Sequence, residues 1–291
     1  MIDKNKIEFY FFIFFVKLFK LLGLNNTRKA ASYIGFILYY IFPIRKKVVI
    51  ENLHNAFPGK NEKEINLIAY RCYKNICTTF FELMYLPNLS KEQISNLIQC
   101  ENASIIRNSF EKGKGAIFLT GHIGSWEVAA LTSISVSGIP MTLLAQPQRN
   151  KYITLWLNKA RSRFGNKVLE LGLSVRQVYQ AIKNGELVGI VGDQRGPRDV
   201  KRVDFFGRPT SLYPGAVSFA LKARCPIILA VVIRLETGNY KAIFENLDFD
   251  NLPDDHDERV REMNQRYISF IEKYVRQYPE QYFWMHKIWK Y

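Results

Sequence analysis

Residues 115–128 read Gly115-Ala116-Ile117-Phe118-Leu119-Thr120-Gly121-His122-Ile123-Gly124-Ser125-Trp126-Glu127-Val128. The apolar start predicts a buried strand that ends at a tight turn, and the residues from Trp126 onward suit a helix packed on the sheet. His122 would then lie just past the carboxyl end of a strand, where open α/β sheets bind ligands. Glu127 falls in the first turn of the helix. An imidazole and a carboxylate would therefore meet beside free helix N–H groups.

His122 and Glu127 also have ordinary structural explanations. A glutamate in the first turn commonly caps a helix and complements its dipole. A histidine at a turn is commonly a hydrogen-bonded side chain without a catalytic role. The spacing alone leaves both interpretations open, and the rest of the chain favours the catalytic one.

Apolar runs alternate with helical segments on both sides of this stretch. Such alternation predicts an α/β fold with a mostly parallel central sheet flanked by helices. Residues 45–112 predict a helical platform without evident chemistry. The predicted strands are 115–120, 140–145, 168–171, 186–192 and 226–233, with a further candidate at 239–246, and the predicted helices are 125–136, 150–164, 174–184, 214–224 and 255–278.

A second polar cluster, Gly192-Asp193-Gln194-Arg195-Gly196-Pro197-Arg198, follows the apolar run 187–191. Asp193 is either a second candidate to orient the imidazole of His122 or a turn residue that closes the loop. The loop is strongly basic, which suits phosphate binding or a solvated face. Its candidate substrate-binding residues are Arg195, Arg198, Lys201 and Arg202, together with Arg208 in the segment Phe205-Phe206-Gly207-Arg208-Pro209.

Further side chains complete the candidate site. Arg161 and Arg163 lie on the predicted helix 150–164, and either guanidinium is a candidate to stabilise an oxyanion. Phe205 and Phe206 form a hairpin tip that packs on the core or a lip that meets lipid. The four histidines are scattered without metal-ligand spacing, so neither a metal nor another cofactor is expected.

The composition limits the partners of the protein. A net charge of +15 indicates an anionic partner, such as nucleic acid, lipid head groups, a phosphorylated substrate or an acidic protein. The four cysteines have no framework or C-x-x-C spacing, which predicts free thiols.

The first 24 residues decide among these anionic partners in favour of a membrane over nucleic acid. The run from Phe9 to Val16 is wholly aromatic or aliphatic, and Lys17 and Lys20 follow it. It is short for a span of about 20 apolar residues, so an interfacial or shallow anchor is predicted. A second apolar helix is predicted at 33–44, before the basic residues Arg45-Lys46-Lys47, which suit the cytoplasmic leaflet. Packing on the core of the catalytic domain explains this helix equally well.

Five ordered motifs resemble those of the lipid A biosynthesis (late) acyltransferase family, which includes the lauroyl and myristoyl transferases. The segment Gly121 to Glu127 is similar to the family's G-H-F-G-N-W-E core, with Ile123 and Ser125 as departures. The other matching segments are Asn52 to Pro58, Gly192 to Gln194, Phe205 to Pro209 and Pro279 to Lys287.

This resemblance implies an O-acyltransferase that moves a fatty acyl chain from a carrier thioester, acyl carrier protein or coenzyme A, to a hydroxyl of a lipid A precursor or related glycolipid. It implies a cell inner membrane location, with the catalytic part on the cytoplasmic side. The resemblance favours Glu127 over Asp193 as the partner of His122. The expected division is residues 1–44 as membrane-associated helices and residues 45–291 as the acyltransferase domain.

Two other functions stay open at this point. The same scaffold suits an O-acyltransferase for a phospholipid or an aminolipid. A membrane-associated protein that binds a lipid or docks a carrier protein without catalysis is the second alternative.

Overall fold

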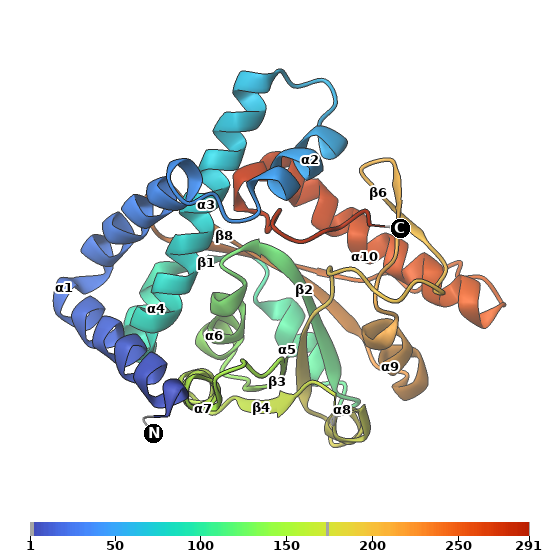
Figure 1. Ribbon diagram of the computed structural model, residues 1–291. Coiled ribbons are helices and arrows are strands. Elements are labelled where there is room, and N and C mark those ends of the chain that lie inside the picture. The colour runs from blue at the N-terminus through green and yellow to red at the C-terminus, as the bar shows by residue number, and fades with distance from the viewer. Residues whose placement is uncertain (1–2, 173–174, 291) are drawn as a thin grey trace.

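A computed structural model describes residues 3–172 and 175–290 of the chain (Figure 1). In these residues the centre of the fold is a seven-stranded sheet with the strand order β1-β9-β8-β2-β5-β3-β4. Its pairs are parallel except β8 with β9, which is antiparallel. The strands are β1 (Ile98–Cys100), β2 (Ala116–Gly124), β3 (Met141–Ala145), β4 (Lys167–Glu170), β5 (Leu187–Val191), β8 (Ile227–Arg234) and β9 (Tyr240–Asn246).

Helices cover both faces of this sheet, and the side chains of β2 alternate between the two layers. Ile117 and Leu119 join the core under α8, α9 and α10, whereas Ala116 and Phe118 join the core under α4, α5 and α6. This two-residue period is the expected consequence of a strand buried on both faces. The helices are α4 (Lys91–Leu97), α5 (Ser104–Phe110), α6 (Trp126–Val136), α7 (Lys151–Arg161), α8 (Val175–Lys183), α9 (Gly215–Ala223) and α10 (His256–Gln277).

The chain before the sheet is helical. Helix α1 (Lys4–Tyr40) is broken into two arms at Gly23, whose φ of 76° favours glycine (Figure 1). The helix α2 (Lys46–Ala56) and the short turn η1 (Leu86–Asn88) flank the long helix α3 (Glu62–Tyr85). No helix among the described residues combines the length and the apolar character that crossing a membrane requires.

The α/β class and the mostly parallel sheet are confirmed. The second apolar helix expected at 33–44 is instead part of the second arm of α1, because the helix continues unbroken from the kink to Tyr40. The strand expected at 115–120 is also longer, since β2 runs to Gly124 after a register shift beyond Thr120. His122 therefore lies within the end of β2 and not in a turn after it. Residue 174, the first of the predicted helix 174–184, lies outside the described residues, as does residue 173.

The segment around Phe205 and Phe206 is a hairpin of β6 (Val203–Phe205) and β7 (Arg208–Thr210) that packs on the core. Both phenylalanines are buried, and the ring of Phe206 contacts those of Phe57 and Trp284. Of the two expectations for this hairpin, the core-packed one is correct. The four cysteines are free thiols, as expected.

Candidate active site

His122 and Asp193 form the centre of the candidate site. The ring Nδ1 of His122 lies 2.6 Å from Asp193 Oδ1, and the backbone N–H of His122 donates to Asp193 Oδ2 at 2.7 Å. The carboxylate is almost fully buried, while the imidazole keeps 20% of its surface exposed. A carboxylate at Nδ1 holds the ring proton there and leaves Nε2 as a proton acceptor. This arrangement suits a general base.

Two glycines allow the end of β2 to approach its neighbours. A Cβ atom at Gly121 would lie 2.9 Å from Asp193 Oδ2, so any side chain there would press on the carboxylate. Gly124 has a φ of 62°, and a Cβ atom at this position would lie 2.0 Å from the carbonyl oxygen of Val232. Glycine is therefore required on either side of His122 for steric reasons.

Aromatic and amide side chains surround the exposed edge of the imidazole. The rings of Trp126 and Phe283 have centroids 5.3 Å and 6.0 Å from that of His122. The backbone N–H of Phe283 donates to the carbonyl oxygen of His122 at 2.9 Å. The Nε2 amide of Gln194 lies 3.2 Å from His122 Nε2. A substrate hydroxyl that replaced this amide would reach the same ring nitrogen.

Buried tyrosines surround Asp193. The hydroxyl of Tyr267 donates to the carbonyl oxygen of Thr120 at 2.8 Å. Burial and the charge of Asp193 raise the pKa of both Tyr267 and Tyr282 well above its usual value. Both phenols therefore stay neutral, and they exclude water from the buried side of the carboxylate.

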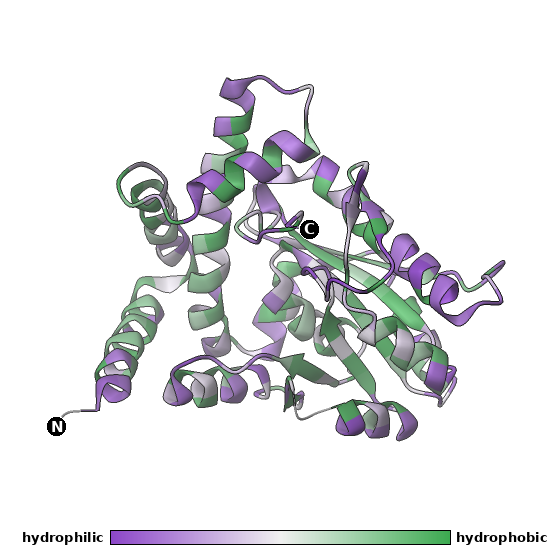
Figure 2. Ribbon diagram, turned by 45° about the vertical axis from the view of Figure 1, so that its right-hand side comes forward, coloured by the Kyte–Doolittle hydropathy of each residue, from purple (hydrophilic) through white to green (hydrophobic). Residues whose placement is uncertain are grey.

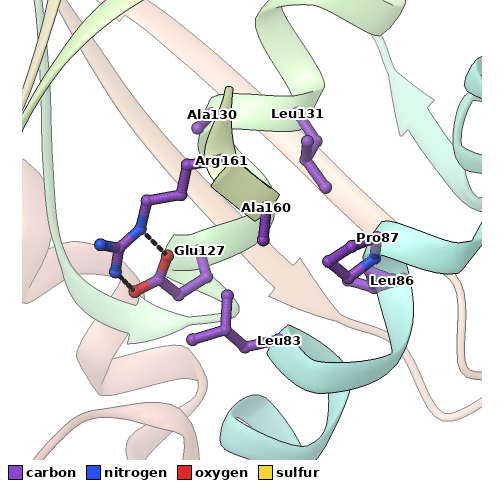
Figure 3. A pocket seen from close by; sticks show the side chains of 8 residues that line it. All are labelled: Leu83, Leu86, Pro87, Glu127, Ala130, Leu131, Ala160 and Arg161. Atoms are coloured by element: carbon purple, nitrogen blue, oxygen red, sulfur yellow. Dashed lines mark hydrogen bonds and ion pairs between the residues drawn. The ribbon is translucent and has the colours of Figure 1, made fainter. Parts of the chain in front are cut away.

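Glu127 pairs with Arg161, as Figure 3 shows. Its carboxylate makes no hydrogen bond or ion pair with His122. Its carboxylate accepts from Arg161 Nε at 3.1 Å and from Nη2 at 2.6 Å. Both side chains are more than four-fifths buried. The pair borders a pocket of about 20 Å³ whose other lining residues are Leu83, Leu86, Pro87, Ala130, Leu131 and Ala160. Of the two candidate carboxylates, only Asp193 thus orients the imidazole.

The other predicted residues are spread around this centre. Arg163 lies beyond the end of α7, with its guanidinium 5.1 Å from the ring centroid of Phe164. Lys201 pairs with Asp255 and Glu258 at the start of α10. The guanidinium of Arg208 lies 5.7 Å from the Trp289 ring centroid. None of these contacts brings the side chain to His122. Arg198 and Arg202 follow β5 on the same exposed loop.

Two residues at the site were not predicted as members of it, Gln194 and His286. The Nε2 of His286 accepts the backbone N–H of Arg195 at 3.2 Å, next to Gln194. The guanidinium of Arg195 donates to the carbonyl oxygen of Lys287 at 3.1 Å. Burial and the charge of Arg195 lower the pKa of His286. The recurrence of Gln194 and His286 in two of the five motifs was the available signal.

Comparison with known proteins gives the family of this chain. The sequence profile of bacterial lipid A biosynthesis acyltransferases matches residues 4–291. The chain belongs to this acyltransferase family. A lipid A biosynthesis acyltransferase of Haemophilus influenzae is 24% identical, over 94% of this chain and 84% of that protein. The lipid A biosynthesis palmitoleoyltransferase of Escherichia coli K12 is 21% identical, over 84% of this chain and 79% of that protein.

Membership of the lipid A acyltransferase family identifies the protein as an acyltransferase of lipid A biosynthesis. The family's G-H-F-G-N-W-E core corresponds to the end of β2 and the start of α6 in this chain. Within residues 3–172 and 175–290, no three His, Cys, Asp or Glu side chains gather as metal ligands would.

Proposed function

We propose that this acyltransferase moves a fatty acyl chain from an acyl carrier protein thioester to a hydroxyl of a lipid A precursor, with His122 as the general base. The observation that carries the mechanism is the 2.6 Å contact between His122 Nδ1 and Asp193. It fixes the tautomer that leaves Nε2 ready to accept a proton. Asp193 acts as a positioning residue, and its negative charge stabilises the imidazolium once it forms.

The reaction needs one proton transfer in each direction. The acceptor hydroxyl gives its proton to His122 Nε2 as its oxygen attacks the thioester carbonyl carbon. The tetrahedral intermediate then collapses, the carbon–sulfur bond breaks, and the imidazolium returns the proton to the departing thiolate. No G-x-S-x-G nucleophile motif occurs in the sequence, which supports direct transfer without an acyl-enzyme.

The start of α6 and the side chain of Arg161 are candidates to stabilise the oxyanion. Helix α6 begins directly after β2, and its N-cap Ser125 makes no side-chain capping bond, so the first N–H groups of the helix can receive an anion. Arg161 is the second candidate, since Glu127 binds its Nε and Nη2 and leaves Nη1 for a ligand. In this proposal Glu127 positions Arg161.

The donor and the membrane location rest on charge and on exposed apolar surface. Acyl carrier protein is acidic and a lipid A precursor is phosphorylated, and a net charge of +15 attracts both. Phe11 and Phe14 of α1 are 66% and 58% exposed, which suits shallow insertion into the inner membrane from the cytoplasmic side. Figure 2 shows hydrophobic residues along both arms of this helix.

The decisive experiment is mass spectrometry of lipid A from a strain that lacks this chain. Lipid A should lack one acyl group, and wild-type protein should restore it, whereas His122→Ala should not. Purified protein assayed with acyl carrier protein and coenzyme A donors in parallel identifies the donor. Unchanged lipid A with an altered phospholipid or aminolipid would move the activity to that acceptor. Full restoration by His122→Ala would instead favour a binding protein without catalysis.

A further inference from the structure

A groove of about 450 Å³ opens between α1 and α3, apart from the residues around His122. Its size falls within the roughly 300–1,000 Å³ typical of ligand pockets. The lining combines cationic, hydroxyl and aromatic side chains: Lys29, Ser32, Tyr33 and Phe36 from α1, with Tyr70 and Lys74 from α3. This combination matches a ligand that has an anionic head and an apolar body.

The two helices come into backbone contact beside the groove, at Gly35. A Cβ atom at Gly35 would lie 2.7 Å from the Cα of Lys74, so the backbones are in contact there. Beside this contact, the rings of Phe36 from α1 and Tyr70 from α3 meet edge to face, with centroids 6.5 Å apart. Both rings line the groove.

The charge of the groove is uniformly positive. Lys29 and Lys74 both line it, and in the described part of the chain neither forms an ion pair with a carboxylate. The Nζ of Lys74 lies 5.4 Å from the ring centroid of Tyr70. The sequence has no Asp or Glu between Glu8 and Glu51. Two uncompensated ammonium groups in one groove attract an anion.

The rim of the groove is apolar and open to solvent. Tyr33 is 73% exposed, Phe36 is 45% exposed and Tyr40 is 58% exposed. Soluble surfaces seldom gather large aromatic side chains in this way, and such side chains favour the boundary between head groups and acyl chains of a bilayer. An acidic protein would meet the lysines but would gain little from this rim.

We propose that the groove binds the head group of one anionic phospholipid of the bilayer. Its phosphate lies between Lys29 and Lys74, its glycerol against Ser32, and its acyl chains along Tyr33 and Phe36. The bound lipid fixes the rotation of α1 on the membrane and thereby the orientation of the catalytic sheet. This inference rests on the proposed membrane location and adds a specific lipid site to it.

Isothermal titration of the full chain with short-chain phosphatidylglycerol, kept below its micelle concentration, tests the site without acyl transfer. The Lys29→Gln, Lys74→Gln double variant should bind about thirtyfold more weakly, since each lysine near an anionic head group contributes a factor of about five. The matched control is Lys112→Gln with Lys114→Gln, which removes two charges from an exposed loop and should bind like wild type. Lys29→Arg with Lys74→Arg should retain binding.

Four outcomes would overturn the proposal. Equal binding of inorganic phosphate would indicate a simple anion site, and equal weakening in the loop control would indicate only a net charge effect. If the double variant loses acyl carrier protein binding but keeps lipid binding, the groove belongs to that protein. If the double variant unfolds at the wild-type temperature and binds lipid like wild type, the site is rejected. The titration contains no acyl donor or acceptor, so its result tests the lipid site whether or not the proposed acyl transfer occurs.

Discussion

Arg28 of α1 and Glu82 of α3 form an ion pair, with 2.7 Å between Nε and Oε1, and the Glu82 side chain has no exposed surface. Arg234 of β8 binds the same carboxylate through its Nε at 3.0 Å. The hydroxyl of Ser125, the residue before α6, donates to Glu82 Oε2 at 3.4 Å. One buried carboxylate therefore links the N-terminal helices and the sheet to the turn that follows His122.

Glu82→Gln should lower the free energy of unfolding by about 3–5 kcal/mol, because it leaves two buried guanidinium groups without their counter-charge. Burial opposes ionisation of Glu82, but Arg234 and Arg28 outweigh it, and the pKa of Glu82 is lowered. Urea unfolding measures the loss. The matched control is Glu258→Gln, whose carboxylate pairs with Lys201 at the surface and should matter much less. Equal losses in the two variants would refute the role of Glu82.

The fold could be predicted because the pattern of apolar residues along the chain follows which positions are buried. The run from Ala116 to Leu119 is apolar throughout, as a strand between two helical layers requires. The three-residue β1 escaped prediction because so short a strand has no period to detect. The antiparallel direction of β9 is likewise a property of the connection after β8 and not of the residues in the strand.

The sequence pointed to the two residues at the centre of the candidate site but not to their pairing. His122 and Asp193 were identified because each follows an apolar run, and the carboxyl ends of parallel neighbours β2 and β5 meet at one edge. The family resemblance favoured Glu127 as the partner of His122. The backbone turn at Gly124 and the start of α6 direct Glu127 to Arg161 instead, and neither is readable from spacing.

Activity should fall as the pH drops below about 6.5, the usual histidine pKa, if His286 positions the loop that carries Gln194. Its pKa is lowered in the folded protein by burial and by Arg195, so the unfolded chain binds more protons in this range. The contribution of His286 to stability is therefore fully present above the pKa it has in the unfolded chain. This contribution is lost as the pH falls through the lower pKa that His286 has in the folded protein. Protonation would also remove the acceptor for the Arg195 N–H.

The measurement is thermal unfolding and turnover across this pH range for wild type and His286→Gln. The glutamine variant should lose the acid-side step in stability, because it carries no group that titrates there. A step of the same size in both proteins would show that another group is responsible.

Phe11→Ser and Phe14→Ser should each weaken binding to lipid vesicles by about tenfold or more. Burial of a phenylalanine side chain in an apolar medium contributes about 1.5–3 kcal/mol, and both side chains are exposed on α1. Vesicle sedimentation measures the partition. Tyr213→Ser, which removes an exposed aromatic side chain outside α1, is the control and should leave the partition unchanged. If the two α1 variants bind vesicles as well as wild type does, this arm of α1 is not the membrane anchor.

The catalytic pair is tested by comparing Asp193→Asn with Glu127→Gln. His122→Ala should lower kcat by about 10²–10⁴-fold, the usual share of a positioned base. Asp193→Asn should approach that loss, because an amide that donates to Nδ1 would force the ring proton onto Nε2, where the base must be free. Glu127→Gln keeps that tautomer and only loosens Arg161, so its loss should be smaller. Steady-state acyl transfer measures all three variants.

The order of these losses decides between two carboxylates that the sequence alone could not separate. In the geometry described here Asp193 touches both the ring and the backbone N–H of His122, whereas Glu127 touches neither. Arg161→Lys is the matched variant for the second pair, and it should resemble Glu127→Gln because a lysine cannot form the two-pronged contact. If Glu127→Gln costs more kcat than Asp193→Asn, while both proteins unfold at the wild-type temperature, Glu127 orients the base during turnover and the assignment to Asp193 is wrong.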